Sequence, residues 1–478
     1  MIGMRMTIRG LGVISMLILA RLLVPADFGL VALATLVRGI VEMASQFGFD
    51  NAIIQNQKAD HRHYNSAWTL NVIRGVVSGV VIVAIAGPAA RFFNEPRLVD
   101  IMYWLALASV ISGLENIGIV EFRSKLNFHK EYKFFVFVKL SSFIVTLAVA
   151  FAYRSYWALV VGIVVGATTM FVLSYTMHPY RPRFDLSKAG ELFKFSKWLL
   201  VNEYLVFAAK NIDRFLIGRF LDAASLGVYS LAKEIATLMS SELVLPITRA
   251  IYPGYAKISH DPERLKEMFL HTLGLVFLFS WPMAFGIAAV AEPFTLVVLG
   301  EKWALVTKIL PYLAIGGALY FAWVNAASLF MAAGRPHLAT VMFVAGTVLR
   351  ISLLTAGYYW NGLIGIAQAT MVEPIVGFPI GYVLVRRIID LDLTTYFRTV
   401  WRSIAASLLM FVAVTALGGA VAELPDAARL VLLIASGAAV FVAIQFILWR
   451  IAGCPSGAES QLIDLVRERW SVRTATKI

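Results

Sequence analysis

The chain has 478 residues, of which 59% are hydrophobic and only 15% are charged, and its mean hydropathy is +0.77. Soluble domains carry about 25% charged residues, so this composition excludes an ordinary soluble protein and indicates a membrane-embedded one. The net charge of +13 raises the question of a nucleic-acid partner. The placement of the basic residues, described below, argues against that partner.

Apolar segments long enough to cross a bilayer recur along the whole chain. About 20 helical residues span a hydrocarbon core of roughly 30 Å. Runs such as VVSGVVIVAIAG, from Val76 to Gly87, are continuously apolar and lack the alternation of a β-barrel strand. We therefore predict an all-α integral membrane protein with fourteen transmembrane helices. They are expected near residues 7–24, 28–49, 67–87, 98–119, 134–153, 156–177, 198–218, 225–247, 270–291, 309–333, 338–358, 362–386, 402–422 and 428–450.

The loops between these helices differ in their basic residues. If the N-terminus is cytoplasmic, Lys and Arg gather in the inner loops and are scarce outside, as the positive-inside rule requires. Both termini are then cytoplasmic, and the tail stretch LIDLVRERW predicts a short amphipathic helix on the inner surface. The inner set includes Arg123, Lys125, Lys130, Lys133, Arg181, Arg183, Lys188, Arg264, Lys266, Arg386, Arg387, Arg467 and Arg469.

A short motif occurs twice. ARLLVPADFGLVALA, from Ala20, and GRFLDAASLGVYSLA, from Gly218, align with Arg21 on Arg219 and Gly29 on Gly227. The first copy lies at the end of predicted helix one, and the second lies at the end of predicted helix seven. Because an even number of helices separates them, they have the same orientation, which indicates parallel repeats related by an axis along the membrane normal.

The repeat predicts the domain organisation. Residues 1–180 form an N-terminal six-helix lobe, and residues 181–400 form a second six-helix lobe that begins with an amphipathic cytoplasmic linker. Residues 401–452 add two transmembrane helices, and 453–478 form a cytoplasmic tail. Three GxxxG spacings, at Gly75 and Gly79, Gly162 and Gly166, and Gly377 and Gly381, predict close helix packing.

Basic residues inside the predicted helices are the candidate binding groups. Each costs about 2.5–3.5 kcal/mol to bury and should face a partner or a watery cavity. On helix seven, Lys210 and Arg214 are four residues apart on the same face as Glu203, and they repel each other unless an anion is near. A phosphate-bearing substrate is the simplest such anion. The candidate cationic set is Arg38, Arg74, Lys139, Lys210, Arg214 and Arg350.

Acidic residues at similar depth are candidates for ion pairing or for coupling transport to protons or sodium. For Arg38 and Glu42, which lie four apart on one helix face, an internal ion pair and a substrate role both remain open. Salt bridges to neighbouring helices are likewise the alternative for Lys210 and Arg214. These acids are Glu42, Glu115, Glu203, Asp213 and Glu373, and the candidate sugar contacts are Trp68, Asn71, Tyr204, Trp323 and Asn325.

Nothing in the sequence indicates a catalytic, cofactor or metal site. The single cysteine, Cys454, excludes a cysteine-based metal cluster and an intramolecular disulfide. His61 and His63, in the run HRHY, could share a metal, but the run favours a solvated loop.

The motifs ILARLLVPADFGLVALA, KNIDRFLIGRFL, LGVYSLA, LGEKW and AAGRP resemble the polysaccharide-transport branch, the Wzx-type flippases, of the multidrug, oligosaccharidyl-lipid and polysaccharide exporter superfamily. The resemblance covers nearly the whole chain. It implies two lobes around a cationic cavity in the bacterial inner membrane. The substrate it implies is a lipid-linked oligosaccharide, commonly on undecaprenyl diphosphate, moved to the outer leaflet for O-antigen, capsule or exopolysaccharide synthesis. Similar proteins carry more residues before the equivalent of Arg9, so an upstream start codon is expected.

The expected partners are the lipid-linked oligosaccharide, membrane lipid and the polysaccharide polymerase and chain-length machinery, with no cofactor and no nucleic acid. Two alternatives remain. A drug exporter of the same superfamily would favour acidic over basic cavity residues. A membrane polysaccharide polymerase or ligase would need a catalytic outer loop, whereas the longest predicted one, 291–308, is short and apolar.

Overall fold

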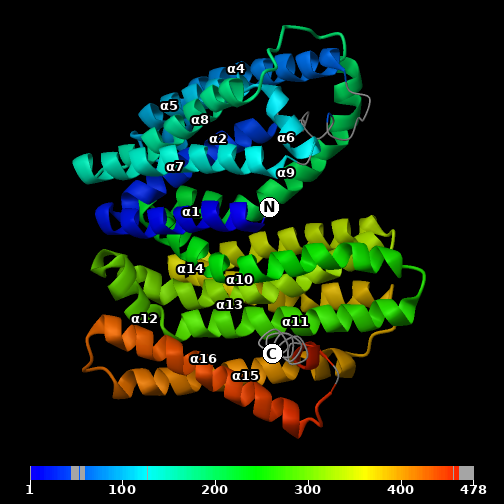
Figure 1. The fold of residues 1–478 in the computed structure, drawn as a ribbon. Helices are drawn as coiled ribbons and strands as arrows, with labels where there is room; N and C mark the ends of the chain where they lie inside the picture. Colours follow the sequence, from blue (N-terminus) through cyan, green and yellow to red (C-terminus); the bar gives the residue numbers. More distant parts are fainter. Residues whose placement is uncertain (1, 45–52, 54–59, 126, 456, 462–478) are drawn as a thin grey trace, which may run out of the picture. The chain divides into compact units, whose positions relative to one another are not determined.

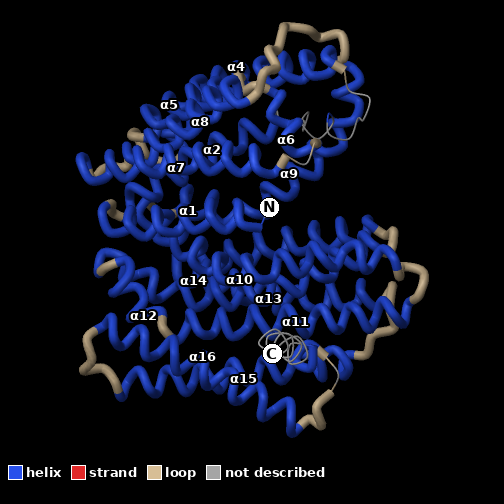
Figure 2. Tube along the Cα trace, in the orientation of Figure 1, coloured by secondary structure: helices blue, strands red, loops and turns tan. Residues whose placement is uncertain are grey.

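The computed structural model describes residues 2–44, 53, 60–125, 127–455 and 457–461. For residues 2, 44, 192–206, 209 and 239–250 this description is limited to the backbone. All regular elements within these ranges are helices (Figure 2). The predicted all-α fold is therefore confirmed.

The chain forms two compact units, Met1–Ser230 (unit 1) and Leu231–Ile478 (unit 2) (Figure 1). The division falls inside helix α10, Ala223–Lys257. This division reflects which helices pack together, whereas the predicted lobe boundary at residue 180 was placed from the sequence repeat. The lobe assignment therefore stays a prediction. Unit 1 contains α1 (Ile2–Leu22), α2 (Pro25–Ala44), α4 (His61–Phe92), α5 (Leu98–Gly113), η1 (Ile117–Ile119), α6 (Val120–Ser124), α7 (Phe128–Tyr153), α8 (Trp157–Met177) and α9 (Ala189–Phe220).

Unit 2 contains the remaining helices. α14 joins the predicted spans 338–358 and 362–386, and it is broken between them by non-helical dihedral angles at Asn361 and Gly362. Asn361 lies at φ −152° and Gly362 at φ +53°, a region that glycine enters without steric cost. After α10 come α11 (Pro262–Ala289), α12 (Ala291–Phe294), η2 (Thr295–Leu299), η3 (Glu301–Trp303), α13 (Ala304–Ala332), α14 (Pro336–Arg386), α15 (Leu393–Ala420) and α16 (Asp426–Ile451).

Each of the fourteen predicted spans overlaps one of these helices. Among the described residues, nine helices are long and apolar enough to cross a membrane, or ten if α5 and the short helices after it form one span bent by 66°. The buried Asn116 holds this bend, because its backbone N–H donates to Ser174 Oγ and its side chain accepts from Gly118 N–H. The number of fourteen crossings remains a prediction.

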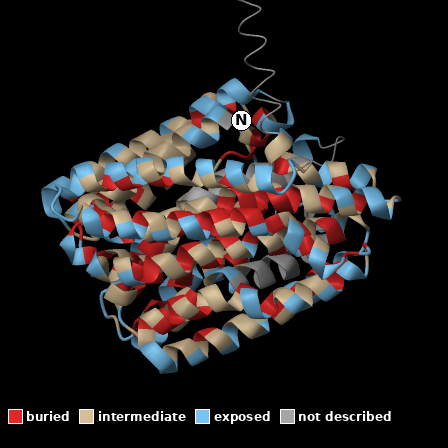
Figure 3. Ribbon diagram, turned by 90° about the horizontal axis from the view of Figure 1, so that it is seen from below, coloured by how far each residue is buried: buried red, intermediate tan, exposed pale blue. Residues whose placement is uncertain are grey.

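Buried residues gather on the faces where helices pack, and exposed residues lie on the outer faces (Figure 3). Many of the exposed residues are large and apolar. Within unit 1, α4 and α5 approach closely through the first predicted GxxxG pair. A methyl group on Gly75 would lie 2.8 Å from Gly113 Cα, and one on Gly79 would lie 2.6 Å from Val110 Cγ2. The prediction that these glycines serve packing is therefore confirmed.

The two copies of the repeated motif contact each other inside unit 1. A Cβ atom on Gly29 would collide with the Ala223 carbonyl oxygen, and one on Gly227 would collide with the Pro25 carbonyl oxygen. Each of these Cβ atoms would also lie 2.9 Å from the backbone nitrogen of the other glycine. This reciprocal contact is the pattern expected where a two-fold axis relates two parallel repeats.

The glycine contact can be tested by thermal unfolding of the purified protein in detergent. Gly29→Ala and Gly227→Ala should each lower stability by about 1–3 kcal/mol or more, because the added methyl group meets backbone that cannot rotate away. Gly10→Ala is the matched control, since no atom lies within 4 Å of a Cβ at that position. Equal melting temperatures for Gly29→Ala and Gly10→Ala would contradict the close contact.

Candidate functional site

Five of the six candidate basic residues lie in unit 1, and Arg350 lies in unit 2. α9, which carries Lys210 and Arg214, packs on α2, which carries Arg38. The two helices run antiparallel, because Gly39 lies beside Phe207 and Leu33 lies beside Gly218. A methyl group on Gly39 would be 2.9 Å from the Phe207 ring, so Arg38 and Lys210 are at nearly the same level along the helix pair.

Arg38 forms the internal ion pair that its spacing allowed. Its Nε lies 2.8 Å from Glu42 Oε1, and the two side chains are 16% and 30% exposed. The Ser109 hydroxyl on α5 donates to the same carboxylate oxygen at 2.8 Å. Glu42 thus links α2 to α5 and fixes the direction of the Arg38 side chain.

Arg74 lies at this same level on α4. Its neighbour Gly75 packs on the Ser109 carbonyl oxygen, and Ser109 is the residue that binds Glu42. The Arg74 side chain is half-buried, and its Nε has no hydrogen-bond partner among the described residues. A guanidinium that is partly desolvated in this way is suited to receive an anionic oxygen.

On α9, Lys210 is exposed and Arg214 is half-buried. The Arg214 Nε is buried without a hydrogen bond in the described part of the chain, whereas its backbone N–H donates to Asp213 Oδ1 at 2.8 Å. Asp213 itself is fully buried and accepts a hydrogen bond of 2.7 Å from the Tyr229 hydroxyl, so it connects α9 to α10. The side chain of Glu203 lies outside the described residues.

Lys139 is half-buried on α7, where α7 packs against α1. Its ammonium nitrogen would be 3.9 Å from a Cβ atom on Gly12. Arg9, one turn earlier on α1, is close enough to repel Lys139 electrostatically. Arg9 was not among the candidates from the sequence. Arg9 lies three residues before Gly12 and so shares its face of α1. This spacing is the sequence signal that could have identified Arg9.

Unit 2 holds an ion pair of its own. Arg350 Nη1 lies 3.2 Å from Glu373 Oε2, and their side chains are 13% and 12% exposed. The two residues lie on either side of the break in α14. The remaining candidate acid, Glu115, is half-buried near the bend that follows α5.

The candidate sugar contacts contribute mainly to packing. Trp68 is buried and donates its indole N–H to the Leu114 carbonyl, and Asn325 is buried and accepts from the Tyr255 hydroxyl at 2.9 Å. Trp323 is buried against Gly346 and Gly377. Asn71 is half-buried, and the Tyr204 side chain lies outside the described residues.

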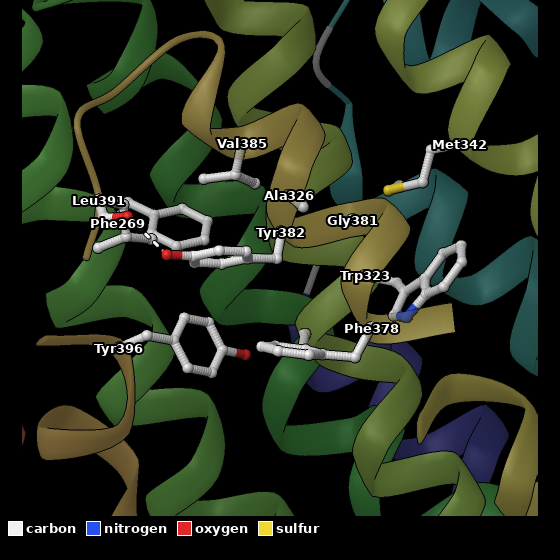
Figure 4. A pocket seen from close by; sticks show the side chains of 11 residues that line it. Phe269, Trp323, Ala326, Met342, Phe378, Gly381, Tyr382, Val385, Leu391 and Tyr396 are labelled. Atoms are coloured by element: carbon white, nitrogen blue, oxygen red, sulfur yellow. Dashed lines mark hydrogen bonds between the residues drawn. The ribbon is translucent and has the colours of Figure 1, made fainter. Parts of the chain in front are cut away.

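A small cavity in unit 2 is lined by Trp323 and other aromatic residues (Figure 4). The rings of Phe378, Tyr382 and Tyr396 gather around it, and the Tyr382 hydroxyl donates to the Leu391 carbonyl at 2.9 Å. Its volume of about 30 Å³ suffices for one or two water molecules and is too small for a sugar ring. Among the residues that the structure describes, no three His, Cys, Asp or Glu side chains could together hold a metal ion.

Residues 18–308 match the family described as polysaccharide biosynthesis protein. The chain belongs to this family. Family relatives include the lipopolysaccharide biosynthesis protein WzxC of Escherichia coli, which is 26% identical, with 86% of this chain and 84% of WzxC covered. The teichuronic acid biosynthesis protein TuaB of Bacillus subtilis is 28% identical over 76% of each chain.

Solved structures show the same fold. The lipid II flippase MurJ, in an inward closed conformation, superposes with a TM-score of 0.74 at 13% identity and covers 94% of this chain and 98% of its own. An inward-facing multidrug transporter of the MATE family has a TM-score of 0.57 at 16% identity, covering 80% and 95% of the two chains. This family member is therefore a multi-pass membrane protein of the polysaccharide flippase branch of the exporter superfamily.

The ion pair in unit 2 should be structural. Glu373→Ala should destabilise the protein by about 3–5 kcal/mol, because it leaves the Arg350 charge buried without its carboxylate. The double variant Arg350→Met with Glu373→Leu should recover most of that loss, since no charge is left behind. Thermal unfolding in detergent measures both. A Glu373→Ala protein with an unchanged melting temperature would contradict the structural role.

Proposed function

We propose that this protein flips a lipid-linked oligosaccharide from the cytoplasmic to the outer leaflet of the bacterial inner membrane, for the synthesis of a surface polysaccharide. The family match and the named relatives, which act in lipopolysaccharide and teichuronic acid biosynthesis, support this function. The observation that carries the substrate class is the set of cations on α2, α4 and α9. An undecaprenyl diphosphate carrier presents an anion that such groups bind.

The proposed architecture has two parallel six-helix lobes, followed by two further helices. The reciprocal contact of Gly29 and Gly227 supports the pseudo-two-fold relation between the repeats. Lys210 and Arg214 would line a water-accessible cavity together with Arg38, Arg74 and Lys139.

Transport by alternating access requires that the ligand interact differently with two states of the protein. A diphosphate held by the cations of α2, α4 and α9 meets this requirement if the groups separate as the protein changes state. Arg38, which Glu42 and Ser109 orient, is a fixed member of the set. Arg214, whose Nε has no hydrogen bond among the described residues, is the member that a substrate oxygen can satisfy.

Export of the anion is assisted by the membrane potential, by about 2.3 kcal/mol per charge per 100 mV. Exchange of protons or sodium at Glu42, Glu115 or Glu373 is the second proposed source of energy. Glu203 and Asp213 are the other members of the proposed set of pairing or coupling acids. A polymerase and chain-length machinery are the proposed downstream partners, because a flipped repeat unit must be assembled outside.

One assay in a deletion strain distinguishes the flippase function from the two alternatives, a polymerase and a drug exporter. Loss of a flippase traps lipid-linked repeat units on the cytoplasmic side, whereas loss of a polymerase leaves single units on the outside. Loss of a drug exporter changes neither and sensitises the cells to small molecules. The cationic set favours the flippase, since a carrier of cationic drugs needs acidic groups.

The proposed orientation places both termini and the segment 121–133 in the cytoplasm. A periplasmic reporter such as alkaline phosphatase fused after Lys130 should be inactive, because basic residues are retained on the inner side. A fusion after Arg154 is the matched control and should be active. Activity after Lys130 would contradict the fourteen-helix topology.

Arg214→Ala should lower export at least about tenfold, since a charge-assisted pair of hydrogen bonds to the diphosphate is lost. The protein should still insert and be expressed. Arg214→Lys should restore part of the activity, because the charge survives without the bidentate fork. Surface polysaccharide and trapped lipid-linked sugar measure the effect.

The control for this series is Lys308→Ala, which removes an exposed charge of the predicted outer surface and should leave export unchanged. If Arg214 instead belongs to a structural ion pair, Arg214→Ala should reduce the amount of folded protein, and removal of its acidic partner should restore it. Normal expression with normal surface polysaccharide would overturn the substrate role.

A further inference from the structure

The connection between α8 and α9 is an extended segment that lies along the start of α4 (Figure 1). We call residues 178–188 the strap. Its backbone N–H groups bond to polar side chains on one face of α4: Arg183 to Asn65 Oδ1 and Asp185 to Thr69 Oγ1, both at 3.0 Å, and Lys188 to Ser66 Oγ at 3.1 Å. These bonds satisfy backbone donors that a loop would otherwise leave to water.

Both ends of the strap are also fastened. At its start, Asn116 donates to the Tyr180 carbonyl at 2.6 Å, and the Tyr180 hydroxyl bonds Asn65 Oδ1 at 2.5 Å. Burial raises the pKa of Tyr180 to about 12, so this hydroxyl keeps its proton. Just beyond its end, Glu191 is bound by Lys188 at 2.6 Å and lies 3.3 Å from His63 Nε2.

His178 begins the strap as a neutral imidazole. Its Nδ1 accepts the Tyr180 N–H at 3.2 Å, which places the ring proton on Nε2, 3.5 Å from Glu121 Oε2. Burial lowers the pKa of His178 and outweighs the opposing effect of the Glu121 carboxylate. The strap is therefore a fixed surface of unit 1 at neutral pH.

The hydrogen bonds set the depth of the strap. α4 enters the predicted hydrocarbon region at residue 67, and strap residues 185 and 188 are bonded to Thr69 and Ser66. The Phe184 ring lies 4.9 Å from the ring of the buried Trp68, so one side of Phe184 contacts α4 at this same level. With α4 entering the bilayer at residue 67 as predicted, the strap lies where the headgroups meet the acyl chains.

Two large apolar side chains of the strap are left uncovered by protein at this depth. Phe184 is 74% exposed and Leu186 is 52% exposed. Exposure of this extent is unfavourable in water and favourable against acyl chains.

Basic side chains of the strap and of α4 lie near these two apolar residues. Arg181 donates to the carbonyls of His178 and Tyr180 and so holds the backbone, whereas the Arg183 side chain is exposed. Arg62, in the first turn of α4, is also exposed and is close enough to attract Asp185. The Asp185 carboxylate accepts a hydrogen bond of 2.7 Å from the Ser187 N–H, so a backbone group partly satisfies its negative charge.

We infer that the strap is a lipid-docking surface, which inserts Phe184 and Leu186 into the inner leaflet and binds the phosphates of anionic phospholipids with Arg183 and Arg62. The occupant is bulk phospholipid, so the inference is independent of the proposed substrate and needs only insertion of the protein in a bilayer. Docking of the strap would hold the cytoplasmic end of α4 and the start of α9 at a constant depth.

The depth is tested on the full chain in nanodiscs, with Cys454→Ala as background and a fluorophore on Phe184→Cys or Leu186→Cys. Both positions are exposed, so each label can reach the medium around the protein. Lipids brominated near the headgroup end should quench both labels, and aqueous iodide should quench them little. A label on Glu263→Cys, an exposed site at the start of α11, is the control and should show the reverse. Equal iodide quenching at 184 and 263 would overturn the inference.

The charge recognition is tested with spin-labelled phosphatidylglycerol and spin-labelled phosphatidylcholine as quenchers of the label at 184. The anionic lipid should quench more strongly. Each of Arg183→Gln and Arg62→Gln should reduce this preference by up to about fivefold, the contribution of one basic residue near an anionic surface. Lys257→Gln, an exposed charge outside the strap, should leave the preference intact. Equal quenching by the two lipids in the unmodified strap would overturn the recognition of anionic headgroups.

Discussion

The cost of placing a charge among apolar helices is the constraint on which the rest of this structure depends. A guanidinium or carboxylate in a membrane needs a partner, and the structure provides one in different ways. Arg38 and Glu42 satisfy each other on one helix, and Ser109 adds a bond from the next. Arg350 and Glu373 do so across the break in α14. The Nε atoms of Arg74, Arg214 and Arg350 are buried without a hydrogen bond among the described residues, but the Nη1 of Arg350 is paired with Glu373.

Glycine makes the arrangement of these charges achievable. Only a residue without Cβ lets α4 approach α5 at Gly75, or lets α2 meet α10 at Gly29 and Gly227. The first contact places Gly75, the neighbour of Arg74, against Ser109, which binds Glu42. The second joins the two copies of the repeated motif. Small residues therefore determine which helices are neighbours, and the neighbours determine which charges meet.

Outside the apolar helices the same requirement applies to the backbone. The strap has no regular structure of its own, and it satisfies its N–H groups with the side chains of Asn65, Ser66 and Thr69. These polar residues occur in the first turns of α4, where a helix that simply crossed a membrane would not need them. The fixed strap then presents its apolar residues and arginines to the inner leaflet.

The sequence by itself determined the helical class, the approximate helix positions and the close packing at Gly75, because hydropathy and small-residue spacing are local properties of the chain. The sequence also indicated the ion pair of Arg38 with Glu42 as one of two possible roles, since a spacing of four places both residues on one helix face. Only the tertiary structure decided that Trp68, Trp323 and Asn325 are buried in packing, that Asp213 binds Tyr229 and that Arg9 lies near Lys139. The reason is physical: which side chain of one helix meets which of another depends on the rotation and approach of both helices, and no periodicity within one segment contains that information.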